Sequence, residues 1–272
     1  MATVPGKAAE RIRTELKRFQ PILQSTKSRD VNESDTVVIV TDILQFIFGY
    51  DKYAEITSEH MIRGTYCDLA VKLDGRLAFL LEVKSIGTDL KDNHVKQAVD
   101  YAANQGVEWV GLTNGHVWRV YKVTFSKPIE AEVVVDTDLL ALNHREAGTI
   151  DLLGLFAKEG WQKARLAEHH AHKQVLIKYT LAAAILSEPV LDAIRRQLRR
   201  VSPDIKISEE DLRDSLSNDV LKREVIEGDK AAAAARQVAR AEGRALRKQK
   251  DEQETASEPT GAQMVATESP AT

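Results

Sequence analysis

The chain has 272 residues, 43% of them hydrophobic, and a formal net charge of −3. This length allows one well-formed core and a second, smaller module, and the charge gives no global signature of nucleic-acid binding. A single cysteine, Cys67, excludes an internal disulfide and is expected to be a small buried strand residue. With no apolar N-terminal signal and no long apolar run, the sequence predicts a cytoplasmic protein that does not associate with a membrane.

The first 62 residues predict two helices and a strand. Apolar residues recur at helical spacing over 7–24, which indicates an amphipathic helix packed on the core. The polar start at 32–35 precedes a helix over 35–48 that is apolar on most sides and is therefore expected to be largely buried. Alternating residues over 53–62 predict the first strand.

The stretch 64–84, GTYCDLAVKLDGRLAFLLEVK, predicts two strands joined by a turn. Glu82 and Lys84 share one face of the second strand because side chains alternate along a strand. Asp68 joins them only if the connection has an odd length, so we expect a three-residue loop, Leu73-Asp74-Gly75, with Gly75 in the left-handed conformation. A strict two-residue Asp-Gly turn would place Asp68 on the other face.

Two carboxylates, a backbone carbonyl from Val83 and several waters suit a hard cation such as Mg²⁺, or Mn²⁺ in its place. Such an ion polarises a phosphate and lowers the pKa of a bound water, and Lys84 would hold or help to deprotonate that water. The alternative is that Asp68, Glu82 and Lys84 form only the charged rim of a hairpin.

A helix over 92–104 follows, with a polar N-terminus and with Gly106 at its end. Strands are expected over 107–112 and 116–123, separated by an Asn114-Gly115 turn. Binding of a phosphate backbone requires cations that neutralise its charge. The basic residues nearest to the acidic pair are Arg63, Lys91, Lys96, Arg119 and Lys122.

The ordered combination of these residues resembles a known family. The resemblance depends on Asp68, Glu82-Val83-Lys84, Gln97-x-x-x-Tyr101 and the run GVEWVGLTNGHVWRVY over 106–121. Over roughly 32–123 the chain resembles the N-terminal nuclease domain of type I restriction enzyme R subunits, within the PD-(D/E)XK nuclease superfamily. It has no GxxxxGK[ST] phosphate loop, so it is not expected to be a complete translocating subunit.

The resemblance implies a restriction-endonuclease-like core, ordered as helix, three strands, helix, strand, in an α/β fold. It implies metal ligation by Asp68 and Glu82, and Lys84 as the catalytic lysine. It also matches Glu33 to an acidic position near the metal. Finally, it places Gln97 and Tyr101 near the DNA, with His94 one helical turn before Gln97.

The rest of the chain predicts a mainly helical C-terminal extension and a disordered tail. One more strand is expected over 130–135 and helical material from 137 onward, with a capped helix that starts at Ser208 and runs to about Val225. His169, His170 and His172 have only adequate spacing for zinc. The expected organisation is a nuclease-like domain over 1–136, a helical module over 137–228, and an exposed basic helix with a disordered tail over 229–272.

Three functions are consistent with this sequence. The leading hypothesis is a Mg²⁺-dependent nuclease that hydrolyses phosphodiester bonds in DNA, with restriction or defence as its expected setting. The second is a non-catalytic nuclease-fold module that binds DNA or a protein partner. The third is an interaction protein whose basic tail, over 229–250, contacts nucleic acid or a partner or forms a solvated tether. A homodimer is a further expectation, since cutting both strands with one site per chain requires two copies.

Overall fold

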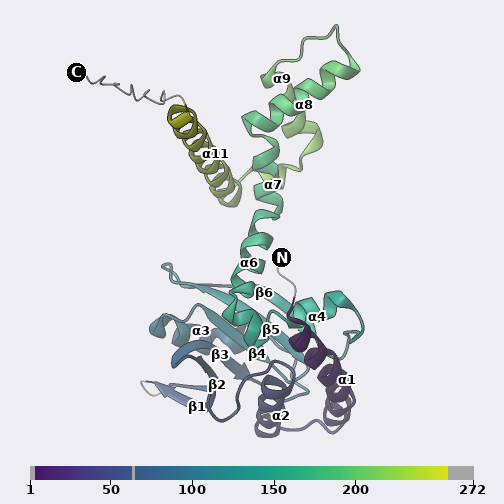
Figure 1. Cartoon of the computed structure of the whole chain (residues 1–272), viewed down its shortest axis with the longest axis vertical. Helices are drawn as coiled ribbons and strands as arrows, with labels where there is room; N and C mark the ends of the chain where they lie inside the picture. Colours follow the sequence, from purple (N-terminus) through teal and green to yellow (C-terminus); the bar gives the residue numbers. More distant parts are fainter. Residues whose placement is uncertain (1–3, 63–64, 257–272) are drawn as a thin grey trace, which may run out of the picture. The chain divides into compact units, whose positions relative to one another are not determined.

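The computed structural model describes the backbone of residues 4–62 and 65–256, and the side chains of residues 4–58 and 67–248. The chain divides into two compact units, Met1–His170 and Ala171–Thr272 (Figure 1). Arg63 and residues 257–272 of the tail predicted to be disordered lie outside the described residues, whereas 251–256 continue the last helix.

The first unit is built on a mixed six-stranded sheet, in which the strands follow one another in chain order. Only β3 and β4 are parallel, and every other neighbouring pair is antiparallel. The strands are β1 (Ile56–Ile62), β2 (Thr65–Leu73), β3 (Arg76–Val83), β4 (Trp109–Thr113), β5 (Val117–Thr124) and β6 (Glu130–Asp138). The predicted α/β class is confirmed at this level.

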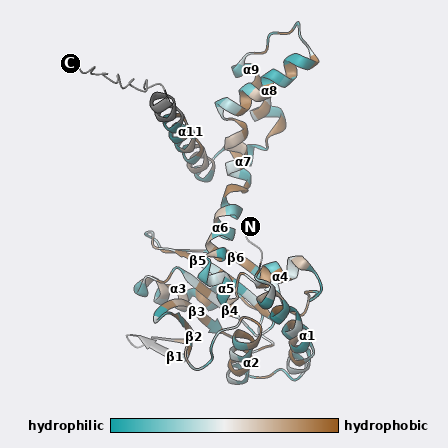
Figure 2. Ribbon diagram, viewed as in Figure 1, coloured by the Kyte–Doolittle hydropathy of each residue, from teal (hydrophilic) through white to brown (hydrophobic). Residues whose placement is uncertain are grey.

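Helices cover both faces of this sheet, because its strands alternate between two apolar clusters. Leu69 and Val71 of β2 belong to one cluster, together with α1 (Gly6–Ser28) and α2 (Glu33–Phe46). Ala70, which lies between them, belongs to a second cluster formed with α3 (Asp92–Gln105). Figures 1 and 2 show α3 apart from α1 and α2, and mostly apolar residues along β3 and β4.

Local signals in the sequence account for these helices. The apolar stripe of α1 is buried, as expected from its spacing. The Asn32 side chain caps α2 by accepting a hydrogen bond from the backbone N–H of Asp35 at 2.9 Å. Gly106 ends α3 in the left-handed conformation, with φ of 68°.

The turn of the β2–β3 hairpin differs from the predicted one. Leu73 pairs directly with Arg76, so the turn is the two-residue Asp74-Gly75 type, and both residues have positive φ, of 50° and 74°. Such turns match the twist of the flanking strands. The predicted three-residue loop is therefore wrong. The odd residue is instead taken up by a β-bulge, because Val71 pairs with Phe79 whereas Lys72 pairs with Leu77.

The first unit extends beyond the boundary expected at residue 136. Strand β6 continues to Asp138, and the helices α4 (Ala147–Leu153) and α5 (Lys158–Gln162) follow in the same unit. The Tyr50 hydroxyl donates to the carbonyl of Phe156 at 2.8 Å, and Arg11 forms an ion pair with Glu159 at 2.7 Å. These contacts make the segment after β6 part of the first unit, not the start of the second.

The second unit is helical, and α6 (Arg165–Val175) leads into it. Its further helices are α7 (Lys178–Ile185), α8 (Glu188–Val201), α9 (Glu209–Ser215), the π-helix η1 (Leu216–Val220), α10 (Arg223–Ile226) and α11 (Asp229–Ala256). Ser208 caps α9 as predicted, by accepting from the N–H of Asp211 at 3.0 Å. The helix expected to run to Val225 is instead interrupted by η1. Within 4–62 and 65–256, no helix is both long enough and apolar enough to cross a bilayer.

Candidate active site

Two carboxylates meet where β2 lies beside the end of β3. Leu69 pairs with Leu81, and Asp68 and Glu82 are the next residues on the two strands. The charge of Asp68 acts on Glu82, which places the two carboxylates near each other. The Asp68 carboxylate accepts a hydrogen bond from the backbone N–H of Val83 at 2.7 Å, which holds it against β3. Because the neighbours Leu69, Leu81 and Val83 face α1 and α2, Glu82 faces the side of the sheet that α3 covers.

Lys84 joins this pair from the end of β3. Its ammonium nitrogen lies 2.7 Å from Oε1 of Glu82 and 3.5 Å from Oε2 of Glu33, the first residue of α2. The backbone N–H of Lys84 donates to the carbonyl of Thr113 at 2.8 Å, so β4 fixes the position of the lysine. The structure therefore brings together Asp68, Glu82 and Lys84, and also Glu33.

The cluster carries excess negative charge in a partly dry environment. Burial, and then the charge of Asp68, raise the pKa of Glu82, although the hydrogen bond from Lys84 acts in the opposite direction. Burial also raises the pKa of the Cys67 thiol to about 12, with further contributions from the charges of Glu82 and Asp68. Cys67 is buried, as predicted, and at neutral pH its thiol is protonated and unreactive.

The same charges keep Lys84 protonated. Burial alone would lower the pKa of its ammonium group, but the hydrogen bond that it donates to Glu82 and the charges of Glu82, Glu33 and Asp68 together raise it. Lys84 is therefore a fixed cation near the carboxylates. In this arrangement it orients and neutralises rather than accepts a proton.

The donor set fits a hard divalent cation better than a soft one. Within the described part of the chain, no group of three or more His, Cys, Asp and Glu side chains is arranged to hold a metal ion. Mg²⁺ needs only one or two protein carboxylates, because it keeps several waters. Asp68 and Glu82 supply two, and their mutual repulsion is the kind that a bound cation relieves.

The loop after Lys84 is held by a residue whose role the sequence did not reveal. The Asn114 side chain donates to the carbonyl of Thr88 at 3.0 Å and accepts from the N–H of Val117 at 2.8 Å. Asn114 thus closes the predicted β4–β5 turn and also ties the loop at 85–91 to it. Its pairing with Gly115 signalled the turn, but no local pattern could have indicated Thr88.

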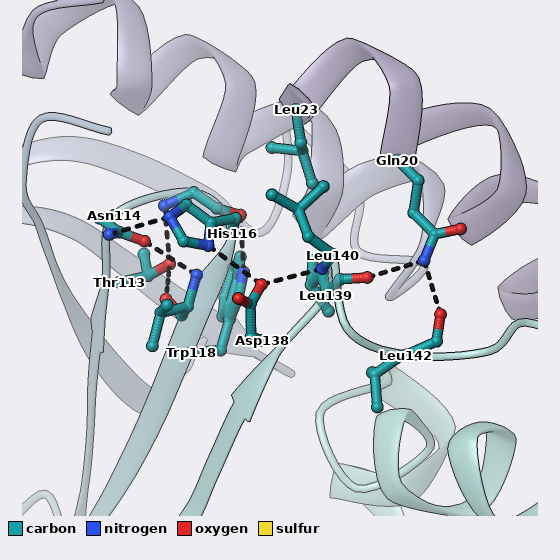
Figure 3. A network of polar contacts seen from close by, with 12 residues as sticks. Gln20, Leu23, Thr113, Asn114, His116, Trp118, Asp138, Leu139, Leu140 and Leu142 are labelled. Atoms are coloured by element: carbon teal, nitrogen blue, oxygen red, sulfur yellow. Dashed lines mark hydrogen bonds and ion pairs between the residues drawn. The ribbon is translucent and has the colours of Figure 1, made fainter. Parts of the chain in front are cut away.

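A polar network continues from this turn toward α1. The His116 ring lies 3.0 Å from the Asp138 carboxylate, which also accepts from the N–H of Leu140 at 2.9 Å. The Gln20 side chain of α1 donates to the carbonyls of Leu139 and Leu142 at 2.8 and 2.7 Å (Figure 3). The motif around residue 116 therefore positions the end of β6 and the segment after it.

The residues expected to contact DNA from α3 have different environments. Gln97 and Lys96 are exposed. The His94 ring accepts from the backbone N–H of Lys91 at 3.3 Å, at the first turn of the helix. Tyr101 is only 5% exposed and packs in the cluster between α3 and the sheet, so its ring contributes to the core of the folded unit.

The two basic strand residues are already paired. Arg119 forms an ion pair with Asp136 at 2.9 Å and donates to the carbonyl of Leu90 at 2.9 Å. It therefore holds the loop that leads into α3. Lys122 forms an ion pair with Glu108.

No family model, curated protein or solved structure matches the chain. The function of the site is therefore inferred from its geometry and from the types of residue that form it.

Proposed function

We propose that the chain is a metal-dependent nuclease that hydrolyses phosphodiester bonds in DNA, with a core of the restriction-endonuclease type. The observation that carries the proposal is the convergence of Asp68, Glu82 and Lys84 at the end of β3. If these residues formed only the charged rim of a hairpin, their side chains would be directed to water. Glu82 is instead 8% exposed, and its burial disfavours the ionised carboxylate, as is common at functional sites.

In this proposal Asp68 and Glu82 hold Mg²⁺ or Mn²⁺, with the carbonyl of Val83 as a third ligand and Glu33 as an additional carboxylate. When bound, the ion polarises the scissile phosphate and lowers the pKa of its water. The hydrogen bond from Val83 N–H fixes the Asp68 carboxylate against the end of β3. The carboxylates of the chain are thus held in position before the substrate binds.

Lys84 supplies the positive charge. Its raised pKa keeps it as an ammonium group, so it positions the attacking water and offsets the charge that develops on the phosphate. A cation held by Glu82 would compete with Lys84 for the same carboxylate. Glu33 is the second partner within reach of the ammonium group.

The exposed face of α3 is the proposed DNA contact. Gln97 and Lys96 project from it, and His94 lies one turn earlier. Arg119 contributes through the loop that it holds, and Tyr101 through the packing of α3. A role in restriction or defence depends on the family resemblance alone.

Plasmid nicking tests the proposal. Wild-type protein is incubated with supercoiled DNA and Mg²⁺ or Mn²⁺, in parallel with Asp68→Asn, Lys84→Met and the control Asp74→Asn. Asp74 lies in the exposed turn of the same hairpin, where asparagine also tolerates positive φ. We expect metal-dependent nicking by the wild type and the control, and a loss of at least about 100-fold in the other two, as is typical when an electrostatic stabiliser is removed.

A non-catalytic DNA-binding module is the second candidate, and the ion pair between Lys84 and Glu82 favours it, because it occupies a ligand oxygen. That function predicts DNA binding with no cleavage under any divalent metal. Cleavage that persists in both Asp68→Asn and Lys84→Met would contradict the proposed site and indicate a contaminating nuclease.

A further inference from the structure

Helix α11 carries a continuous basic face. Arg236, Arg240, Arg244 and Arg247 follow one another at spacings of four, four and three residues, which places them on one side of the helix. All four side chains are exposed, as is that of Lys248.

The opposite face of α11 packs within the second unit. Ala231 and Ala234 are buried and Val238 is half-buried, where α11 lies against α7. Because the alanine-rich side is turned toward α7, the arginine side faces solvent. Packing thus gives the basic face a fixed orientation within its own unit.

Eight arginines outside α11 form ion pairs with carboxylates. These pairs are Arg11–Glu159, Arg13–Glu10, Arg18–Glu15, Arg119–Asp136, Arg165–Asp151, Arg195–Asp192, Arg213–Glu209 and Arg223–Glu227. Among the described side chains, 4–58 and 67–248, none of the four arginines of α11 forms such a pair. Like charges four residues apart destabilise a helix, and an anionic ligand along this face would relieve that repulsion.

We infer that the arginine face of α11 binds the phosphate backbone of nucleic acid without regard to sequence. From Arg236 to Arg247 the helix rises roughly 16 Å, and duplex DNA carries one charge per about 1.7 Å of its axis, so each arginine has phosphates within reach. An anionic membrane fits less well, because membrane-surface helices bury Trp, Phe or Leu, whereas the apolar side of α11 is mostly alanine and packs on α7. The inference deepens the proposed nuclease function and rests on it, since it assigns this helix the retention of the substrate.

Salt-dependent DNA binding by the full chain tests this. The test variant carries Arg236→Gln, Arg240→Gln, Arg244→Gln and Arg247→Gln, which remove the charge and keep good helix formers. The matched control carries Lys7→Gln, Lys17→Gln, Lys27→Gln and Arg29→Gln, an equal charge change on exposed residues of α1 and its C-terminal end. Fluorescence anisotropy with a labelled 20-base-pair duplex, in Ca²⁺ to prevent cleavage, gives affinity between 50 and 200 mM salt.

We expect the test variant to reduce the slope of log affinity against log salt by about three, and to weaken binding about tenfold or more at low salt, while the control stays near the wild type. Duplex RNA of equal length should show the same difference, because the contacts are to phosphate. An equal loss in both variants, or an unchanged test variant, overturns the inference. So does selective loss of binding to phosphatidylserine vesicles with DNA binding intact.

This result is separable from that of the nicking assay. If Asp68→Asn abolishes nicking but the arginine variant binds DNA like the wild type, only the α11 inference fails. If no metal supports cleavage but the arginine variant loses DNA binding, the nuclease proposal fails and the binding role of α11 stands. Far-UV circular dichroism checks that α11 remains helical in the test variant.

Discussion

Glu82 is the residue whose environment is most informative. It lies between a like charge on Asp68 and an opposite charge on Lys84, at the buried end of a strand. Because its pKa is raised in the folded state, its contribution to stability is greatest below the ordinary pKa of glutamate and is lost as pH rises through the raised value. At neutral pH the protein therefore keeps an ionised carboxylate at a cost, as functional sites do.

Replacing Asp68 by asparagine should lower the pKa of Glu82. The change removes one cause of the upward shift and keeps an oxygen that can accept from Val83 N–H, so the local fold is retained. Titration of ¹³C-labelled glutamate side chains by NMR measures the pKa directly. Asp74→Asn, in the hairpin turn, is the control and should leave Glu82 unchanged.

Replacing Lys84 by glutamine should move the same pKa upward. The hydrogen bond and the positive charge of Lys84 favour ionised Glu82, and both are lost. Thermal unfolding then becomes more sensitive to pH, because stability is lost over a higher pH range than in the wild type. Lys72→Gln on the neighbouring strand serves as the control, and shifts of equal sign in Lys84→Gln and Asp68→Asn would contradict this account of the site.

Among the elements, the β2–β3 hairpin decides whether the site exists. Thirteen residues separate Asp68 from Glu82, an odd number that a regular two-residue hairpin cannot accommodate with both on one face. The bulge opposite Val71 and Lys72 absorbs one residue and restores the alignment. Asp68 and Glu82 therefore share a face because of an irregularity inside the strand rather than at its turn.

Deletion of Ala78 should leave the site intact. In its absence Leu77 and Phe79 become adjacent, and their present partners, Lys72 and Val71, are already adjacent, so the hairpin becomes regular with its pairing unchanged. We expect Mn²⁺ binding, measured by calorimetry, to remain within about threefold of the wild type, and the melting temperature to fall by only a few degrees.

The matched control inserts one alanine between Leu81 and Glu82. This shifts Glu82 to the face covered by α1 and α2, where a carboxylate has no partner, so both metal binding and stability should be lost. If deleting Ala78 abolishes metal binding in a protein that still folds, the bulge has a role beyond register.

The sequence predicted those parts of the fold that depend on local signals. Alternation gave the strands, Asn32 and Ser208 the helix starts, and Gly106 a helix end. The bulge was not predictable, because a three-residue turn would equally accommodate the odd number of residues between Asp68 and Glu82. The tie between Asn114 and Thr88 joins residues 26 apart, which no local pattern encodes.

At the scale of the whole molecule, the first unit is completed by residues far from the strands that carry the site. The segment after β6 supplies apolar side chains to the core against α1 and α2, namely Leu139, Ile150, Leu153 and Phe156. The sequence indicates a boundary before this segment, because residues typical of helices begin at that point. Composition reports the type of element, whereas the extent of a domain depends on which surfaces bury one another.

Two fragments test where the domain ends. Residues 1–170 should fold cooperatively, whereas residues 1–136 should not, because the shorter fragment loses six large buried apolar side chains, Leu139, Ile150, Leu153, Leu155, Phe156 and Leu166. Each is worth about 1.5–3 kcal/mol, against a typical total of about 5–15 kcal/mol. Tyr50 reports on this locally. Burial raises the pKa of its hydroxyl well above the ordinary value, and the carbonyl of Phe156 accepts its hydrogen bond. Absorbance titration should show Tyr50 resisting ionisation in 1–170 and titrating near its ordinary pKa in 1–136. Cooperative melting of 1–136, with Tyr50 still resistant, would place the boundary at β6 and leave the following helices as an accessory.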